Sequence, residues 1–274
     1  MIVNADSAQV YRDLPILSAA PSPADRARAD HRLYGVRDGA SPCSAADWAQ
    51  MAKAEIAAIH EADRMPILDG GTGLYIRTLL DGIAPVPEIE TAIRAEVRSA
   101  ATSHNYSRLA DLDPEAAKRL NATDTTRIAR ALEVVLSSGR PLHEWQAERV
   151  GGIGDQVELR PLVLLPPRPC LYERCDRRFA AMVEQGALDE VSELLDRKLD
   201  PALPVMRAIG VPELSDFVRG VTALSEAMRA GQHATRRYAK RQYTWFGNQS
   251  PATWRSVTEP IEEATIELAV SQLS

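Results

Sequence analysis

The first ten residues constrain the fold most, because an apolar start gives way abruptly to polar side chains. Ile2 and Val3 are typical of a buried strand. Asp6, Ser7 and Gln9 follow within a few residues and supply a carboxylate, a hydroxyl and an amide. In an open α/β sheet, ligands bind at the carboxyl edge of the strands. The pattern therefore favours an α/β protein whose first strand ends in a substrate site. The alternative is that Asp6 or Ser7 merely caps the following turn.

Two further buried strands are predicted, at residues 65–69 and 159–165, where short apolar runs are bounded by proline, glycine or charged residues. The glycine-rich run 70–73 separates the first of them from a helix at 74–80. In a strand, glycine loop and helix, backbone N–H groups can face an anion or a substrate hydroxyl. A tight turn that requires positive φ would explain the glycines equally well.

The segment between the opening strand, which contains Ile2 and Val3, and the strand at 65–69 is irregular at its start. Three prolines predict a surface loop at residues 14–26, and a short strand is predicted at 31–36. Ser44 then has the position of a helix cap, and apolar residues recur at helical spacing behind it as far as Arg64.

Composition changes after residue 87, where strand signals disappear. Residues 88–150 are predicted to form a helical insert, while residues 1–87 and 155–274 form the α/β core with C-terminal helices. The helices expected in the insert span about 89–102, 106–111, 114–120 and 125–138. In the last of them, Arg127 and Arg130 share one face, which can be a ligand-binding surface or a solvated face with Glu133 as intrahelical partner.

Basic residues concentrate on two helices of the C-terminal region. Arg174, Arg177 and Arg178 lie just beyond the strand at 159–165, where they can bind a diphosphate or remain solvated. A long helix at about 222–247 carries Arg236, Arg237, Lys240 and Arg241, interleaved with Tyr238, Tyr243, Trp245 and Phe246. A cationic stripe with aromatic side chains suits single-stranded RNA, although some of those aromatics must belong to the core.

Composition limits the class of protein. A net charge of -6 argues against a protein that coats nucleic acid by bulk electrostatics, but it leaves room for a local basic groove. No apolar run is long enough to span a bilayer, and no leader precedes the first strand, so we expect a cytoplasmic protein without a membrane partner. Three cysteines without zinc-type spacing are expected to be structural thiols.

The order of these motifs resembles one family closely, the tRNA dimethylallyltransferases, or tRNA isopentenyltransferases. The resemblance covers almost the whole chain and depends on five motifs in the family's order. They are residues 6–11 (DSAQVY), 70–75 (GGTGLY), 127–133 (RIARALE), 171–178 (LYERCDRR) and 234–245 (ATRRYAKRQYTW). The resemblance implies a P-loop kinase-like α/β fold, with a parallel sheet, a helical insert that closes on a tRNA anticodon stem-loop, and a helical C-terminal region.

The activity implied by the resemblance is transfer of a dimethylallyl group from dimethylallyl diphosphate to N6 of adenine 37, with Mg²⁺ as cofactor and no metal ligand assigned to this chain. Asp6 matches the catalytic base, which accepts a proton from the amine. The adenine must leave its stack to react. Other positions match residues that contact the base, the RNA or the diphosphate. They are Ser7, Ala8, Gln9, Thr72, Arg94, Thr126, Arg127, Ile128, Ala129, Arg130, Arg174, Arg178, Lys240, Arg241, Gln242, Tyr243, Thr244 and Trp245.

One departure from the family pattern concerns the donor site. The family begins with a strand and a P-loop, G-x-x-x-x-G-K-S/T, whose amides and lysine hold the diphosphate, and the motif occurs nowhere in the 274 residues. We therefore expect the first strand and P-loop to be absent from this chain and the true reading frame to start upstream. A second departure is Val211 after Gly210, where the family usually has tyrosine.

Three functions follow from these observations. The first is a tRNA dimethylallyltransferase that acts as a monomer. The second is a catalytically inactive tRNA-binding remnant, which the absent P-loop favours. The third is an adenylate prenyltransferase acting on free nucleotides, against which the helical insert and the basic, aromatic C-terminal helix argue.

Overall fold

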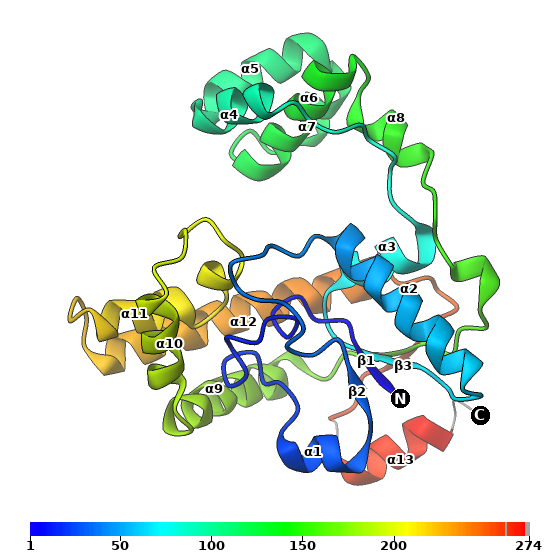
Figure 1. Ribbon diagram of the computed structural model, residues 1–274, viewed down its shortest axis with the longest axis vertical. Helices are drawn as coiled ribbons and strands as arrows, with labels where there is room; N and C mark the ends of the chain where they lie inside the picture. Colours follow the sequence, from blue (N-terminus) through cyan, green and yellow to red (C-terminus); the bar gives the residue numbers. More distant parts are fainter. Residues whose placement is uncertain (261, 272–274) are drawn as a thin grey trace. The chain divides into compact units, whose positions relative to one another are not determined.

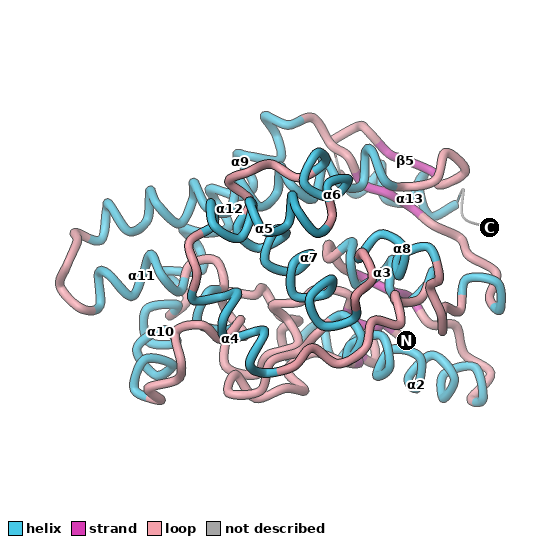
Figure 2. The backbone as a smooth tube through the Cα atoms, turned by 90° about the horizontal axis from the view of Figure 1, so that it is seen from above, coloured by secondary structure: helices cyan, strands magenta, loops and turns pink. Residues whose placement is uncertain are grey.

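The computed structural model describes residues 1–260 and 262–271, and it divides into two compact units (Figure 1). Unit 1 comprises Met1–Leu79 and Gln156–Ser274, and unit 2 comprises Leu80–Asp155. Figure 2 shows that helices dominate and that the strands are short. Within the described residues, no helix is both long and apolar enough to cross a membrane. The predicted insert, residues 88–150, falls inside unit 2.

Unit 1 contains two small parallel sheets. In the first, β1 (Ile2–Asn4) lies between β2 (His31–Arg32) and β3 (Ile67–Asp69), so that Val3 is opposite Arg32 and Leu68. In the second, β4 (Leu162–Leu164) pairs with β5 (Arg255–Val257). The predicted α/β class with parallel strands is thus confirmed.

Most of the helices of unit 1 follow the strands in sequence. They are α1 (Pro23–Arg28), α2 (Ala45–Glu61), α3 (Gly73–Asp81, which continues two residues into unit 2), α9 (Arg168–Glu184), α10 (Ala187–Asp196), α11 (Val211–Val218), α12 (Leu224–Gln249) and α13 (Glu263–Ser271). Short 3-10 turns occur at Gly154–Gln156 and Val205–Arg207. The long helix α12 packs along α9 and α11 (Figure 1).

The core of unit 1 ties β1 to the helices that follow it. Ser44 and Asp47 form the capping box that begins α2, as the sequence predicts. One turn later, the fully buried Trp48 stacks on Tyr75 of α3, with ring centroids 4.6 Å apart. The Trp48 Nε1 donates a hydrogen bond of 2.8 Å to the Asn4 carbonyl, which satisfies the last residue of β1.

A second part of the core joins α9 to α12 through an aromatic ring. Phe179 is buried and its ring lies against Gly231, where a Cβ would meet the Phe179 Cζ at 2.1 Å. Gly210, with φ +95°, also lies against the ring, since a Cβ there would meet the Phe179 Cε2 at 3.2 Å. Two glycines therefore make room for one phenylalanine, and the helices approach closely.

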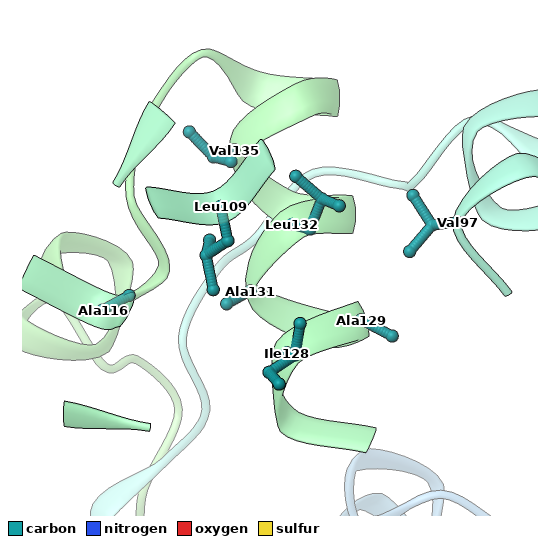
Figure 3. Packing of buried hydrophobic residues seen from close by; sticks show 8 residues of the cluster. All are labelled: Val97, Leu109, Ala116, Ile128, Ala129, Ala131, Leu132 and Val135. Carbon is teal, nitrogen blue, oxygen red and sulfur yellow. The ribbon is translucent and has the colours of Figure 1, made fainter. Parts of the chain in front are cut away.

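Unit 2 is entirely helical apart from one isolated bridge between Ile83 and Val150. Its helices are α4 (Thr91–Ser99), α5 (Thr102–Leu112), α6 (Pro114–Arg119), α7 (Thr125–Ser138) and α8 (Leu142–Ala147). Val97, Leu109 and Leu132 meet in its core (Figure 3). The apolar face of α7 forms the centre of this cluster, in agreement with the helical spacing of its sequence.

The structure corrects several expectations about local structure. The segment 14–26 is not entirely a loop, because Pro23 occupies the first turn of α1, where the missing N–H of proline costs nothing. The strand expected at 31–36 ends at Arg32, since Leu33 adopts a φ of 63°. The helix α8 and the elements β5 and α13 were not expected from the sequence.

Candidate active site

Asp6 is held in place by a buried asparagine at the end of β1. The Asn4 amide donates to the Asp6 carbonyl at 3.0 Å and to the Leu33 carbonyl at 3.1 Å, and its Oδ1 accepts from the Asp6 N–H at 2.7 Å. Asn4 is fully buried, so these bonds are shielded from water. The chain is therefore fixed at the point where it leaves the carboxyl end of β1.

The Asp6 carboxylate caps a turn and also faces a cavity. Its Oδ1 accepts from the Ala8 N–H at 2.8 Å, so the capping role considered from the sequence is present. Burial raises the pKa of the Asp6 carboxyl, and hydrogen bonds from the Ala8 and Gln9 backbone together with the charge of Arg178 offset part of that rise. A carboxylate whose pKa is raised is a stronger base than an exposed one.

The cavity beside Asp6 has a volume of about 300 Å³ and combines charged and apolar walls. Three arginines, Arg178, Arg207 and Arg241, line it together with Asp6. The apolar wall consists of Leu14, Leu17, Phe179, Met182 and Ile209. Such a site suits a molecule with an anionic part and a hydrocarbon part, held near a proton acceptor.

A cluster of hydroxyl groups lies next to the carboxylate. The Ser7 N–H donates to the Thr72 Oγ1 at 2.9 Å, and the Thr72 hydroxyl donates to the Ser7 Oγ at 3.2 Å. The Tyr238 hydroxyl lies close enough to both side chains to interact with them. Burial, followed by the negative charge of Asp6, raises the pKa of Tyr238, so its hydroxyl stays protonated. Ser7, Thr72 and Tyr238 thus form one network that joins β1, the glycine loop and α12.

The glycine loop has a structural reason for its composition. Gly70 has φ +159°, and a Cβ there would lie 2.3 Å from the carbonyl carbon of Ala5. Gly71 lies under Gln242, whose Nε2 donates to the Gly71 carbonyl at 3.0 Å, and Gly73 lies against the Trp245 ring. Close packing against the chain after β1 at Gly70, and against α12 at Gly71 and Gly73, therefore explains these glycines. The positive φ predicted for a tight turn occurs only at Gly70 of the three.

The predicted residues of α12 fall into two groups. Gln242, Tyr243 and Trp245 pack within unit 1: the Tyr243 hydroxyl donates to the Leu165 carbonyl at 3.5 Å, and Arg77 lies over the Trp245 ring at 5.2 Å. Lys240, Arg241 and Thr244 are exposed.

Other predicted residues of unit 1 are divided between the cavity and its surroundings. Arg178 and Ala8 line the cavity, whereas Arg174 is exposed on α9. Gln9 turns away, since its amide donates to the Ser18 and Ala19 carbonyls at 3.1 and 2.9 Å. Gln9 therefore braces the loop that follows residue 14, part of which lines the cavity.

The predicted residues of unit 2 also differ in exposure. Arg94, Thr126, Arg127 and Arg130 are exposed, and Arg127 pairs with Asp124 at 3.5 Å. Ile128 and Ala129 have their side chains in the core (Figure 3). A contact between either of them and a ligand would have to use the backbone.

Sequence reasoning missed several residues that shape the site. Asn4 is described above, Tyr238 was named only as one of the aromatics of the long basic helix, and Arg207 lines the cavity. Glu190 is buried and accepts hydrogen bonds from the Ile16 and Leu17 N–H groups at 2.6 and 2.9 Å. Asn4 could have been found from the sequence, because it is a polar residue at the end of a predicted strand. Glu190 could not, because its hydrogen-bond partners lie more than 170 residues away in the sequence and leave no local pattern.

A resident metal site held by protein ligands alone is not supported by the donor set. Among residues 1–260 and 262–271, no group of three or more histidine, cysteine, aspartate or glutamate side chains is arranged to hold a metal. Mg²⁺ at phosphate sites is commonly held by one or two carboxylates together with the substrate's phosphates. The residues therefore fit at most a magnesium ion that arrives with a diphosphate.

Comparison with known proteins agrees with this geometry. The family model for IPP transferase matches residues 9–249. The chain is 57% identical over 254 residues to the tRNA dimethylallyltransferase of Novosphingobium aromaticivorans, covering 93% of this chain and 90% of the relative. It is 56% identical over 253 residues to the protein of the same name from Sphingopyxis alaskensis, covering 92% and 83%.

Solved structures give the same result. The full-length tRNA isopentenylpyrophosphate transferase of Bacillus halodurans is 30% identical, with a TM-score of 0.67 and coverage of 99% of this chain and 87% of that chain. A eukaryotic dimethylallyltransferase acting on tRNA is 26% identical, with a TM-score of 0.74 and coverage of 89% and 63%. On the family model and these identities, the chain belongs to the IPP transferase family.

Proposed function

We propose that this protein transfers a dimethylallyl group from dimethylallyl diphosphate to N6 of adenine 37 in tRNA, next to the anticodon. The observation that carries the proposal is the Asp6 carboxylate facing a cavity with both arginine and apolar walls. Curated relatives up to 57% identical are named for this reaction, which supports it further. We also propose that the protein acts as a monomer in the cytoplasm.

The reaction is a substitution in which one bond forms and one breaks. The N6 nitrogen attacks C1 of the allyl group, and the bond between C1 and the diphosphate oxygen breaks, so that diphosphate leaves with the electron pair. An exocyclic amine conjugated with a purine is a poor nucleophile, and Asp6 accepts its proton as the C–N bond forms. The raised pKa of the Asp6 carboxyl makes it a better acceptor for this proton.

The donor and the acceptor make different demands on the cavity. We assign the diphosphate to Arg178 in the cavity wall and to Arg174 one turn earlier on α9, because guanidinium groups match phosphate oxygens. The hydrocarbon group requires apolar walls of the kind present here. The target base must flip out of the anticodon loop, and Ser7, Ala8 and Thr72 border the place where it would meet Asp6.

Anticodon-loop binding is assigned to both units. In unit 2 the exposed side chains Arg94, Thr126, Arg127 and Arg130 face solvent, and in unit 1 the exposed residues Lys240, Arg241 and Thr244 do so on α12. Gln242, Tyr243 and Trp245 act indirectly, since they fix α12 against the glycine loop and β4.

The donor site also requires the part of the family fold that holds phosphate. We propose that a strand carrying the P-loop adds to the parallel sheets of unit 1, at the edges formed by β3 and β4. Among the described strands, β3 pairs with β1 alone and β4 with β5 alone, and the side chains of Ile67 and Leu164 on these edges are 54% and 48% exposed. A further parallel strand would cover such apolar edges. A magnesium ion chelated by the diphosphate would neutralise charge on the leaving group.

The test is transfer of labelled dimethylallyl from its diphosphate to an unmodified anticodon stem-loop, compared between this chain and one extended upstream through a P-loop. Transfer by the extended chain alone supports both proposals. Equal transfer by the 274-residue chain overturns the proposal of a P-loop strand, while the proposed dimethylallyl transfer stands. RNA binding without transfer by either chain would identify an RNA-binding remnant. Transfer to adenosine monophosphate instead of the stem-loop would identify a nucleotide prenyltransferase.

A further inference from the structure

Unit 2 contains a buried carboxylate that the proposed reaction does not use. Glu133 on α7 has a side chain only 1% exposed. Its Oε1 lies 2.8 Å from the Arg98 Nε, and its Oε2 lies 3.8 Å from an Arg130 nitrogen. Arg98 belongs to α4, so Glu133 joins two helices that are adjacent in space. A buried carboxylate is expensive to desolvate, and this one is kept with arginines around it.

Positive charge exceeds negative charge at this place. Glu133 is the single carboxylate paired with both Arg98 and Arg130, and Arg94 acts electrostatically on Arg130 together with Arg98. Burial lowers the pKa of Arg130, Glu133 opposes that change, and the charges of Arg94 and Arg98 add to it. The nearest acid on α4, Glu96, is paired with Arg108. An anion bound between the arginines would relieve their mutual repulsion.

The helices place these arginines along one seam. Arg94 and Arg98 are four residues apart and therefore share a face of α4. Val97, between them in sequence, is buried in the core with Ile128 and Leu132 of α7 (Figure 3). The side chains of Arg98 and Arg130 remain 65% and 44% exposed beside that seam. The guanidinium groups are thus anchored on one side and open to solvent on the other.

We propose that Glu133 is a positioning residue that holds Arg98 and Arg130 as a binding site for an RNA phosphate. The inference rests on the proposed function, adds Arg98 to the residues that bind RNA and makes Glu133 the residue that positions it. Arginine binds phosphate through two parallel N–H donors, so its orientation matters as well as its charge. Because the Arg98 side chain is 65% exposed, the ion pair with Glu133 fixes the direction of a guanidinium group that remains open to a ligand.

The test depends on whether Glu133→Gln makes RNA binding tighter or weaker. Glu133→Gln removes a negative charge, so electrostatics alone predicts tighter RNA binding, whereas loss of positioning predicts weaker binding. The measurement is the Kd of the full chain for an unmodified anticodon stem-loop, without allyl donor, over a salt series. We expect Glu133→Gln to weaken binding about tenfold. The slope of the logarithm of the association constant against the logarithm of the salt concentration is negative, and it should become shallower by about 0.7 for each RNA phosphate that the variant no longer neutralises.

A matched control makes the same charge change elsewhere in unit 2. Glu144→Gln on α8 removes the acid that faces Arg140 at 2.9 Å, and it should leave binding unchanged or slightly tighter. Arg98→Ala should weaken binding as much as Glu133→Gln, and the double variant should lose no more than either single variant. Arg108→Ala, which also removes one positive charge, should have a smaller effect.

Binding by Glu133→Gln as tight as wild type, or additive losses in the double variant, would overturn the inference. Thermal unfolding shows whether Glu133→Gln is folded. If it is not, the comparison of Arg98→Ala with Arg108→Ala decides, and equal effects overturn the inference. The proposed function is tested separately by the wild-type protein. If wild type binds the stem-loop and transfers the dimethylallyl group, the proposed function stands even when Glu133→Gln binds as tightly as wild type and the inference about Glu133 fails.

Discussion

Replacing Asn4 by alanine tests whether one buried amide holds the active-site carboxylate in place. The change removes three hydrogen bonds, two to the Asp6 backbone and one to the Leu33 carbonyl. A buried polar group left without a partner costs about 1–3 kcal/mol, and water that enters the space left by the side chain offsets part of this cost. We expect the free energy of unfolding to fall by about 3–5 kcal/mol.

The assay is urea unfolding followed by far-UV circular dichroism, with Asn105→Ala as the matched control. Asn105 is also buried, but its amide makes a single bond of 2.7 Å to the Val97 carbonyl, and its Oδ1 has no hydrogen-bond partner among the described residues. The control should therefore lose only about 1 kcal/mol. At a temperature where it is folded, Asn4→Ala should also turn over slowly. A loss in Asn4→Ala no larger than that in Asn105→Ala would refute the reasoning.

Three further predictions concern the walls and the ionisation of the site. Gly231→Ala places a Cβ 2.1 Å from the buried Phe179 ring and should lower the free energy of unfolding by about 1–3 kcal/mol in a denaturant titration. Gly247→Ala on the same helix meets nothing within 4 Å, so this control should be neutral or stabilising. Tyr238→Phe removes the hydroxyl that interacts with Ser7 and Thr72, so kcat should fall about three- to tenfold with little change in the RNA Kd. Tyr243→Phe should keep kcat near wild type in the same steady-state assay. Because the base must be ionised, kcat/KM in a pH series should fall as the pH drops through the raised pKa of Asp6. Stability should change in the opposite sense, since a carboxyl whose folded pKa is raised stabilises the fold below its ordinary pKa and loses that contribution as the pH rises through the raised value.

Local signals in the sequence predicted most elements of the fold. The apolar start of β1, the capping box at Ser44 and the apolar spacing of α7 each act over a few residues, and all three were read correctly. The short helix α1 was missed because proline was treated as a barrier, although its first turn accepts proline. The polar cluster after β1 was also identified, since the end of a parallel strand is where such residues gather.

Partners distant in sequence account for what the sequence did not reveal. Gln242 and Trp245 match family positions that contact RNA, and Trp245 is also one of the aromatics interleaved with basic residues, yet in the structure they pack on glycines about 170 residues away. Glu190 and Tyr238 likewise acquire their positions from loops near the start of the chain. Nothing in the local sequence distinguishes an aromatic ring that covers a glycine turn from one that stacks on a base.

The most direct test of the account is single-turnover transfer of dimethylallyl by a chain that includes the P-loop, with Asp6→Asn compared with wild type at saturating stem-loop and donor. The account predicts that Asp6→Asn binds the stem-loop within about twofold of wild type but transfers about 10²–10⁴ times more slowly, the range expected for loss of a general base. The variant should also unfold at a higher temperature, because it removes a carboxylate that is destabilised by burial. Transfer by Asp6→Asn within about threefold of the wild-type rate would contradict the role of Asp6 as the base.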